Sequence, residues 1–285
     1  MSKNVLVTGG SGFIGSHIVD LLLKKKYKVT ILDTKNPHRK DVRFIKGSIT
    51  NESIINSSLR NINYVFHLAA VSDINKVGKI PTKTVETNIL GTSYLLEASR
   101  KAKVKRFIFA GSVYSLGGAG NIYTTSKTAS ELLIKNYQLL FKQNYTILRF
   151  STAYGPRNRE ADVISIFVKQ AMKNLNLIVH GNGKQKRNFV YVKDLAKGAM
   201  LAFKKNTNNK ILTIASKKNI NIFNLAKMII GITKSKSKIV CKKNKKRTDD
   251  FNFIFTLKNK KNLVNCFFER SIINGIKNYI NEKKF

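Results

Sequence analysis

The sequence is poor in the residues that build metal sites, disulfide frameworks and membrane spans. Its 285 residues include two cysteines, Cys241 and Cys266, which form no C-x-x-C pair and have no accompanying histidines. We therefore expect no bound metal and no disulfide framework. No apolar run approaches the roughly 18 residues that a bilayer span needs, and the first residues lead into an apolar strand rather than a signal peptide. The sequence accordingly predicts a cytoplasmic protein without a membrane span.

Acidic residues are scarce as well, with 15 Asp and Glu against 53 Lys and Arg and a formal net charge of +38. An excess of this size can indicate a nucleic-acid or membrane-surface partner. The lysines are spread through every segment, however, and no aromatic residues interleave with them at regular spacing to stack bases. We therefore predict no specific nucleic-acid partner, and we expect the charge to attract anionic substrates.

What the sequence does contain, almost at once, is a glycine-rich turn between a strand and a helix. The apolar run 5–7 is followed by Gly9, Gly12 and Gly15, and then by apolar residues at helical spacing. Glycines let the backbone turn sharply and approach a pyrophosphate, whose charge is favoured by the free N–H groups and the dipole of a helix N-terminus. Glycine-rich turns are common and usually structural, so the motif needs a second strand that ends in an acidic residue about 20 residues further on.

Asp33 supplies that context at the end of the apolar segment 28–32. Its carboxylate would accept hydrogen bonds from the ribose hydroxyls of an adenosine and repel a 2′-phosphate, which favours NAD over NADP. Two alternatives stay open at this point. Asp33 could be only a turn former. The basic residues His38, Arg39 and Lys40 could hold a 2′-phosphate if they folded back.

Apolar strand-like runs alternate with helical patterns along the first half of the chain, which predicts an α/β fold with a doubly wound parallel sheet and ligands outside the carboxyl ends of its strands. The less regular second half predicts a smaller C-terminal α/β part. We expect residues 1–155 to form the dinucleotide-binding domain, residues 189–215 to return to it, and residues 156–285 to be mainly substrate-binding. The predicted strands are 5–7, 28–33, 42–45, 64–68, 105–110, 145–150, 177–180, 189–192 and 211–215, and the predicted helices are 51–60, 84–101, 123–142, 162–173, 194–205, 222–231 and 271–280.

Three polar residues form a candidate catalytic group at the end of the fifth predicted strand. Ser112 follows that strand, and Tyr123 and Lys127 lie on one face of the next helix because their spacing is i, i+4. A nearby ammonium would lower the pKa of the tyrosine toward the range of a general base. Lys127 could also hold the nicotinamide ribose, and Ser112 could bond the reacting hydroxyl. An isolated Tyr-x-x-x-Lys is a frequent accident in a lysine-rich chain, but its combination with the glycine turn and Asp33 favours a catalytic site.

Taken together, these motifs resemble those of the extended short-chain dehydrogenases/reductases, in the NAD-dependent epimerase/dehydratase family that includes UDP-glucose 4-epimerase. They follow in the expected order over nearly the whole chain. The matching stretches are 8–15, 67–70, 88–92, Tyr123-x-x-x-Lys127, 148–150, 154–157 and 181–194.

The resemblance implies a Rossmann domain that holds NAD and a smaller C-terminal part that grips a sugar nucleotide. It implies Tyr123 as the base, Lys127 as its partner and Ser112 as the third catalytic member. It also implies that Asp194 is a helix N-cap rather than a catalytic acid. The expected substrate-binding residues are Ser112, Thr152, Arg187 and Arg247, and the expected cofactor-binding residues are Gly9, Gly12, Phe13, Ile14, Gly15, Asp33, Ser48, Ile49, Leu68, Ala69, Ala70, Asn88, Tyr123 and Lys127.

Several positions depart from the family pattern. Ser48 replaces the usual Asp after the third strand, which weakens or replaces an adenine contact, and Thr152 replaces an Asn near the substrate phosphates. The segment between Ser112 and Tyr123 is much shorter than in UDP-glucose 4-epimerases. Val113 and Tyr114 stand where nucleotide-sugar 4,6-dehydratases place an Asp-Glu pair, so the elimination of water has no obvious catalyst.

These observations predict an NAD-dependent sugar-nucleotide epimerase that acts at C4 of a UDP-hexose through a transient keto intermediate. An alternative within the enzymes is an NAD(P)-dependent reductase or dehydrogenase of a nucleotide sugar or related substrate. An alternative from another class is a non-catalytic, basic RNA-binding or scaffold relative.

The resemblance also implies a homodimer formed through the helices 84–101 and 123–142. The sequence gives some independent support, because the second of these helices carries more apolar side chains than one core-facing stripe needs. The alternative is that all of them face the sheet. The residues concerned are Leu132, Leu133, Leu139, Leu140 and Phe141.

Overall fold

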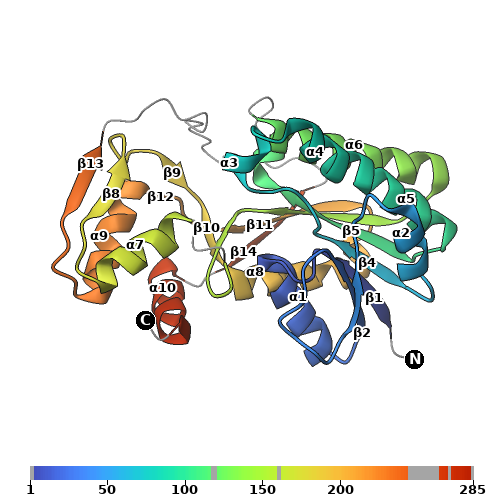
Figure 1. Cartoon of the computed structure of the whole chain (residues 1–285), viewed down its shortest axis with the longest axis horizontal. Helices are drawn as coiled ribbons and strands as arrows, with labels where there is room; N and C mark the ends of the chain where they lie inside the picture. The colour runs from blue at the N-terminus through green and yellow to red at the C-terminus, as the bar shows by residue number, and fades with distance from the viewer. Residues whose placement is uncertain (1–2, 117–120, 159–161, 243–262, 269–270, 284–285) are drawn as a thin grey trace. The chain divides into compact units, whose positions relative to one another are not determined.

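The computed structural model describes residues 3–116, 121–158, 162–242, 263–268 and 271–283. They belong to two compact units. The first is drawn from Met1–Phe150, Ala196–Thr213 and Asn259–Asn265, and the second from Ser151–Leu195, Ile214–Lys258 and Cys266–Phe285. The chain leaves the first unit after its sixth strand and later returns to it (Figure 1).

The first unit is built on an eight-stranded sheet with the order β14-β11-β6-β5-β4-β1-β2-β3. The neighbouring strands from β3 to β6 pair in parallel. This arrangement confirms the predicted doubly wound α/β fold, whose order reverses at β1. Ligands of such sheets bind beyond the carboxyl ends of the strands at that reversal. The strands are β1 (Asn4–Thr8), β2 (Lys28–Asp33), β3 (Arg43–Lys46), β4 (Tyr64–His67), β5 (Arg106–Ser112), β6 (Tyr145–Phe150), β11 (Lys210–Ser216) and β14 (Leu263–Phe268).

Helices cover both faces of this sheet, with α2, α5 and α6 on one face and α1 on the other (Figure 1). The first of these faces packs Leu6, Leu95 and Phe107 into one apolar core, as the alternation of strands and amphipathic helices predicts. The helices are α1 (Phe13–Lys24), α2 (Glu52–Ser58), α3 (Ile74–Val77), α4 (Pro81–Val85), α5 (Gly91–Lys101) and α6 (Ile122–Phe141).

The predicted helix 84–101 is present, but it begins earlier and is not uniform. The chain forms α4, then a π-helical turn at Glu86–Leu90, then α5. A π-turn places one extra residue in the helix and is frequent at functional sites. Here the main-chain oxygen of Asn88 accepts hydrogen bonds from the hydroxyls of Thr92 (2.6 Å) and Ser130 (2.8 Å), so the distorted turn is held by side chains.

The second unit combines short strand pairs with three helices. Its core packs Tyr154, Phe167, Leu225 and Tyr279 together. The sequence patterns did not predict several of its two- to four-residue strands, which are too short to carry a periodic signal. The pairs are β7 (Thr152–Tyr154) with β10 (Phe189–Tyr191), β8 (Leu177–His180) with β13 (Ile239–Lys242), and β9 (Lys186–Arg187) with β12 (Ile220–Asn221), and the helices are α7 (Val163–Met172), α9 (Ile222–Thr233) and α10 (Ile272–Lys283).

The connection between the units also differs from expectation. The predicted helix 194–205 is α8 (Val192–Ala199), followed by 3₁₀ turns at Met200–Phe203 and Lys205–Thr207. Asp194 therefore lies inside the first turn of α8, and its expected role as the N-cap is wrong. Near a helix N-terminus its carboxylate still faces the favourable end of the helix dipole.

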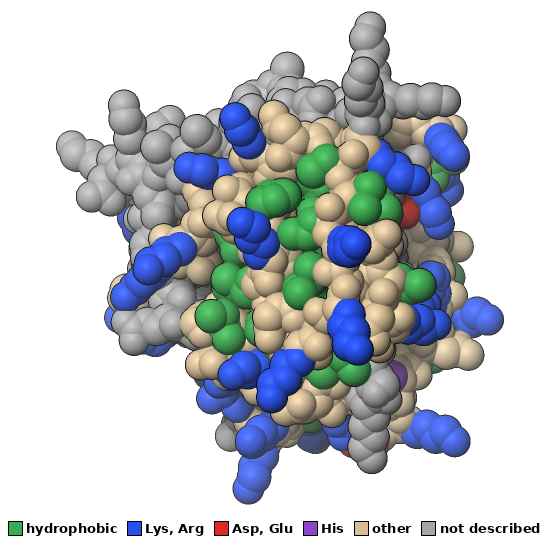
Figure 2. Space-filling view, turned by 90° about the vertical axis from the view of Figure 1, so that its left-hand side faces the viewer, with side chains coloured by type: hydrophobic (Ala, Val, Ile, Leu, Met, Phe, Trp, Pro, Cys, Tyr) green, Lys and Arg blue, Asp and Glu red, His purple; other side chains and the backbone are tan. Residues whose placement is uncertain are grey.

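None of the helices in the described part of the chain has the length and apolar character that crossing a bilayer requires. On the face drawn in Figure 2, lysine and arginine side chains are scattered between apolar ones instead of forming one stripe.

Candidate active site

The glycine turn after β1 forms a cradle of bare backbone. Gly9 has a φ of +71°, and a Cβ atom built there would lie 2.6 Å from the main-chain nitrogen of Ala69. A Cβ atom on Gly15 would collide with the main-chain oxygen of Gly9. Helix α1 then begins at Phe13 after Gly12, which provides no side-chain cap. The uncapped helix start fits a pyrophosphate, because its N–H groups and dipole favour negative charge.

Asp33 lies against this turn at the end of β2. One carboxylate oxygen accepts a hydrogen bond from the main-chain N–H of Ser11 (3.0 Å), and the other accepts one from Lys35 (3.0 Å). The carboxylate is thus held beside the glycine turn, where a ribose diol linked to the pyrophosphate would lie. Phe13 and Ile14 open α1 at the same place.

Ser48 and Ile49 follow β3, the neighbour of β2. The Ser48 hydroxyl bonds the hydroxyl of Thr50 (2.8 Å) and accepts from its main-chain N–H (3.2 Å), and Ile49 is buried. Ser48 therefore stabilises the turn that leads into α2. An Asp in this place would offer a cofactor a carboxylate instead of a hydroxyl engaged with Thr50.

The side chain of Asn88 is hydrogen-bonded to the segment after β4, which contains Leu68, Ala69 and Ala70. Its side-chain oxygen accepts from the Val71 N–H (2.7 Å), and its amide nitrogen donates to the Val71 oxygen (3.0 Å) and to the Ser126 hydroxyl (2.9 Å). Asn88 is 2% exposed. Its side chain thus joins the segment beside the glycine turn to helix α6.

His67, for which we predicted no role, completes a buried hydrogen-bond chain at the end of β4. Its Nδ1 lies 2.8 Å from the Thr8 hydroxyl, and its Nε2 lies 2.9 Å from the Thr92 hydroxyl. The Thr92 hydroxyl donates its own hydrogen to the main-chain oxygen of Asn88, so toward His67 it can only accept a hydrogen bond from Nε2–H. With the proton on Nε2, Nδ1 accepts from the Thr8 hydroxyl. This order requires neutral imidazole. Burial, aided by the charge of Lys127, lowers the pKa of His67 to about 3. Its place in the motif 67–70 was the only sequence signal.

Ser112, Tyr123 and Lys127 come together at the carboxyl end of β5. Ser112 is the last residue of that strand, and α6 begins beside it with Asn121 as N-cap, whose side chain accepts from the Thr124 N–H (3.0 Å). The Lys127 ammonium donates to the Ala110 oxygen (2.8 Å) and lies 5.9 Å from the centre of the Tyr123 ring. The arrangement predicted from the i, i+4 spacing is therefore present.

The pKa values in this group are set mainly by burial. Burial raises the pKa of Tyr123 to about 12, and a hydrogen bond to Ser112 opposes the rise. Burial also lowers the pKa of Lys127 to about 8, while the charge of Glu131 opposes that change. The expected lowering of the tyrosine pKa by Lys127 is thus wrong for this structure. The Lys127 ammonium donates to the Ala110 carbonyl, and the loss of hydration on burial dominates the pKa of the phenol.

Glu131, one turn beyond Lys127 on α6, forms a buried ion pair with Arg149, and its charge favours the protonated form of Lys127. The Arg149 Nη2 lies 2.5 Å from Glu131, and its Nε lies 3.1 Å from both carboxylate oxygens. A Cβ atom on Gly111 would be 2.8 Å from the same carboxylate, so the glycine gives Glu131 its room. Sequence reasoning missed this pair, because 18 positions separate its members.

The predicted substrate-binding residues of the second unit lie on its short strands. The main-chain N–H of Thr152 in β7 donates to the Asn188 oxygen (3.2 Å). Arg187 in β9 is paired with Ile220 of β12, and its Nη1 donates to the Lys186 oxygen (3.3 Å). Arg247 lies outside the described residues.

This chain is similar to several known proteins. Residues 5–215 match the model of the NAD dependent epimerase/dehydratase family. The chain is 35% identical to a protein of Methanocaldococcus jannaschii provisionally named UDP-glucose 4-epimerase, over 80% of this chain and 82% of that protein. It is 34% identical to a UDP-N-acetyl-alpha-D-glucosaminuronate decarboxylase of Bacillus cytotoxicus, over 84% of this chain and 83% of that protein.

A solved structure extends the likeness to the whole fold. The UDP-glucose 4-epimerase of Thermotoga maritima, determined with UDP-glucose, superposes with a TM-score of 0.84 at 26% identity, covering 99% of this chain and 98% of that chain.

Proposed function

This chain belongs to the NAD-dependent epimerase/dehydratase family, whose members use NAD, and from that premise we propose that it is an epimerase that inverts C4 of a UDP-hexose. One observation carries the proposal: Ser112, Tyr123 and Lys127 lie together at the carboxyl end of β5. The glycine turn and Asp33 lie at the carboxyl ends of other strands of the same sheet. A reductase or dehydrogenase with net nicotinamide turnover is not favoured by the relatives.

The glycine turn and Asp33 would hold NAD, which when bound would supply a reversible hydride acceptor for C4 of the sugar. The chain's own residues would manage the proton. Burial keeps the Tyr123 phenol protonated in the protein alone, so the phenol must ionise before it can act as the base. As the phenolate, Tyr123 would take the proton of the C4 hydroxyl and give it back, and Ser112 would hold that oxygen in place through its hydroxyl. Lys127, charged below its pKa of about 8, would stabilise the phenolate during the exchange.

The residues after Ser112 favour epimerisation over the loss of water. Val113 is buried, and the main-chain N–H of Tyr114 donates to the Ser112 hydroxyl (3.2 Å). Neither side chain is a carboxylic acid. A 4,6-elimination needs a base and an acid near C5 and C6 of the sugar, and positions 113 and 114 offer no carboxyl pair for these roles.

The two units would divide the work. We assign the cofactor to the first unit, which holds the glycine turn, and the nucleotide diphosphate of the substrate to the second, through Arg187, Thr152 and Arg247. A guanidinium is suited to this role because its planar N–H groups match phosphate oxygens in pairs.

A homodimer is part of the proposal. Four predicted interface residues on α6 are exposed, namely Leu132 (55%), Leu139 (65%), Leu140 (72%) and Phe141 (47%). Leu133 instead packs against the core. Val85 and Leu90, on the neighbouring α4 and π-turn, are also exposed, and α4 packs beside α6. These exposed apolar side chains on two neighbouring helices support an interface with a second copy of the chain.

Product analysis on a panel of UDP-glucose, UDP-N-acetylglucosamine and UDP-glucuronic acid tests the function. An epimerase converts a substrate into a product of the same mass and leaves the nicotinamide unchanged at equilibrium. A product lighter by water indicates a dehydratase, one lighter by carbon dioxide indicates a decarboxylase, and steady nicotinamide turnover indicates a reductase. Any of these three outcomes contradicts the proposal.

The variant Tyr123→Phe tests the mechanism. It removes the hydroxyl that moves the proton, so the turnover rate should fall by about 10²–10⁴-fold. Tyr137→Phe is the matched control, since it deletes a phenol hydroxyl further along α6 whose oxygen lies 3.5 Å from Glu97. Undiminished turnover in Tyr123→Phe would show that another group is the base.

A further inference from the structure

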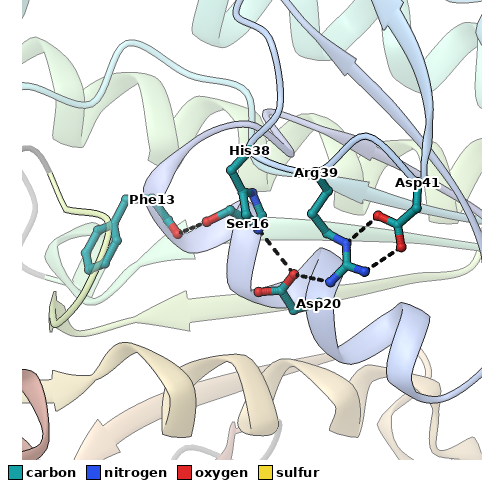
Figure 3. A network of polar contacts seen from close by, with 6 residues as sticks. All are labelled: Phe13, Ser16, Asp20, His38, Arg39 and Asp41. Atoms are coloured by element: carbon teal, nitrogen blue, oxygen red, sulfur yellow. Dashed lines mark hydrogen bonds and ion pairs between the residues drawn. The ribbon is translucent and has the colours of Figure 1, made fainter. Parts of the chain in front are cut away.

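Arg39 is held between two carboxylates on the flank of α1 (Figure 3). Its Nε and Nη2 donate to the two oxygens of Asp41 (2.7 and 2.5 Å), and its Nη1 donates to Asp20 (3.2 Å). Nε2 of His38 lies 3.3 Å from the same Asp20 oxygen. The acidic partners are unusual in a chain with 15 acidic residues in 285. Two of the basic residues that follow Asp33 therefore contact Asp20, on helix α1.

This network fixes where the arginine points. Asp20 lies seven residues beyond Phe13, where α1 begins, so it is roughly 10 Å along the helix from the uncapped N-terminus. Arg39 is a neighbour of Asp33 in the loop between β2 and β3, yet its guanidinium is turned toward the middle of the helix. It contacts Asp41 through two N–H groups, a bidentate geometry that constrains the planar group strongly.

The network is accessible to solvent, so its strength is moderate. The side chains of Arg39, Asp20 and Asp41 are 34%, 32% and 60% exposed. Arg39 nevertheless holds the pKa of Asp41 below its ordinary value through their hydrogen bonds. Ion pairs that solvent reaches are individually weak, but two of them acting on one guanidinium bias its orientation toward Asp20 and Asp41.

We propose that Asp20 and Asp41 determine cofactor selectivity by holding Arg39 away from the adenosine ribose, so that no guanidinium is available to pair with a 2′-phosphate. Asp33 would repel the 2′-phosphate directly. Asp20 and Asp41 would in addition keep the guanidinium of Arg39 from forming an ion pair with that phosphate. The inference concerns dinucleotide binding alone, so it stands or falls independently of the reaction proposed above.

A competition experiment on the protein as purified tests this inference. The protein is equilibrated with mixtures of NAD⁺ and NADP⁺, and the bound nucleotide is released and quantified by chromatography. The measured quantity is the ratio of free NADP⁺ to free NAD⁺ concentration at which the bound nucleotide is half NADP⁺ and half NAD⁺. In Asp20→Asn/Asp41→Asn, this ratio should fall about fivefold from the wild-type value, the size of one partly exposed ion pair.

Two further variants distinguish an effect of the released Arg39 side chain from an effect of the altered net charge. Adding Arg39→Ala to the double variant should restore the wild-type ratio, whereas adding Lys40→Ala, which removes the same charge from an exposed neighbour, should not. Arg39→Ala alone should leave the ratio unchanged.

Three results would overturn the inference. The first is an unchanged ratio in the double variant, with both nucleotides weakened equally, which would make the network purely structural. The second is reversal by Lys40→Ala as complete as by Arg39→Ala. The third is a fall in NADP⁺ affinity in Arg39→Ala alone.

Discussion

His67 illustrates how one buried side chain can be defined by the direction of its hydrogen bonds. Thr8 donates to Nδ1, and Nε2–H donates to Thr92, which in turn donates to the Asn88 oxygen. Protonation of Nδ1 would make this nitrogen a donor. It would then face the Thr8 hydroxyl, which in the present arrangement donates its own hydrogen to Nδ1. The neutral ring is therefore part of the framework that joins β1, β4 and the π-turn.

This arrangement predicts a specific dependence of stability on pH. The pKa of His67 is about 3 in the folded protein against an ordinary value of 6.5, so between these values the unfolded chain binds one more proton than the folded chain. The free energy of unfolding should then fall as the pH falls through this window. His67 accounts for a slope of about 1.4 kcal/mol per pH unit.

Urea denaturation from pH 4 to 6.5 measures this slope. The variant His67→Gln, which removes the titrating ring, should have a slope flatter by about 1.4 kcal/mol per pH unit. His180→Gln, at an exposed histidine on β8, serves as the control. A slope in His67→Gln equal to that of the wild type would contradict the assignment.

At the scale of the elements, the glycine turn joins β1, α1 and the segment after β4 at contact distance. Gly15 brings the first turn of α1 onto the Gly9 carbonyl, and Gly9 packs on the main chain of Ala69. Since backbone meets backbone at both places, no side-chain rotation can make room for a larger residue. The same contacts hold the helix N-terminus at the reversal of the sheet order.

The substitution Gly15→Ala should therefore move α1 away from the turn. We expect destabilisation by about 1–3 kcal/mol from overpacking, together with the loss of retained NAD. Gly231→Ala is the matched control, because a Cβ atom there in helix α9 meets nothing within 4 Å. That change should stabilise the protein by about 0.5–1 kcal/mol. Thermal unfolding and nucleotide retention check both variants, and normal retention in Gly15→Ala would refute the cradle.

Sequence reasoning located the parts of the fold and site that depend on local spacing. The glycines, Asp33, and the Tyr123–Lys127 pair each follow from a short motif next to a strand. The Glu131–Arg149 pair and the position of His67 between two threonines depend on contacts between distant segments, so no periodicity reveals them. The pKa of Tyr123 was mispredicted because the neighbouring charge could be read from the sequence, whereas the burial could not.

For the whole molecule, exposed apolar side chains on α4 and α6 support the proposed homodimer. Leu132 and Leu139 are seven residues apart and lie on the same side of α6, both more than half exposed. In a monomer they would remain in contact with water. In a dimer, burial of the part of each leucine that is still exposed would contribute about 1–2 kcal/mol to association.

Replacing both leucines by glutamate should convert the proposed dimer into a monomer, as measured by sedimentation equilibrium, while the circular dichroism spectrum stays unchanged. Leu175→Glu, at a leucine of the second unit that is 55% exposed, should leave the dimer intact. A wild-type protein that sediments as a monomer at micromolar concentration would refute the dimer itself.

The position of β6 in the sheet has a consequence for how the chain can be made. All six residues of β6 are buried, and in the sheet order it stands between β5 and β11. Because β11 is formed by Lys210–Ser216, a fragment cut near residue 155 would expose β6 as an open edge, a ready template for pairing with another chain. On the ribosome the same edge stays unpaired until residue 216 has emerged. During that interval the unpaired strand makes the nascent chain prone to aggregation.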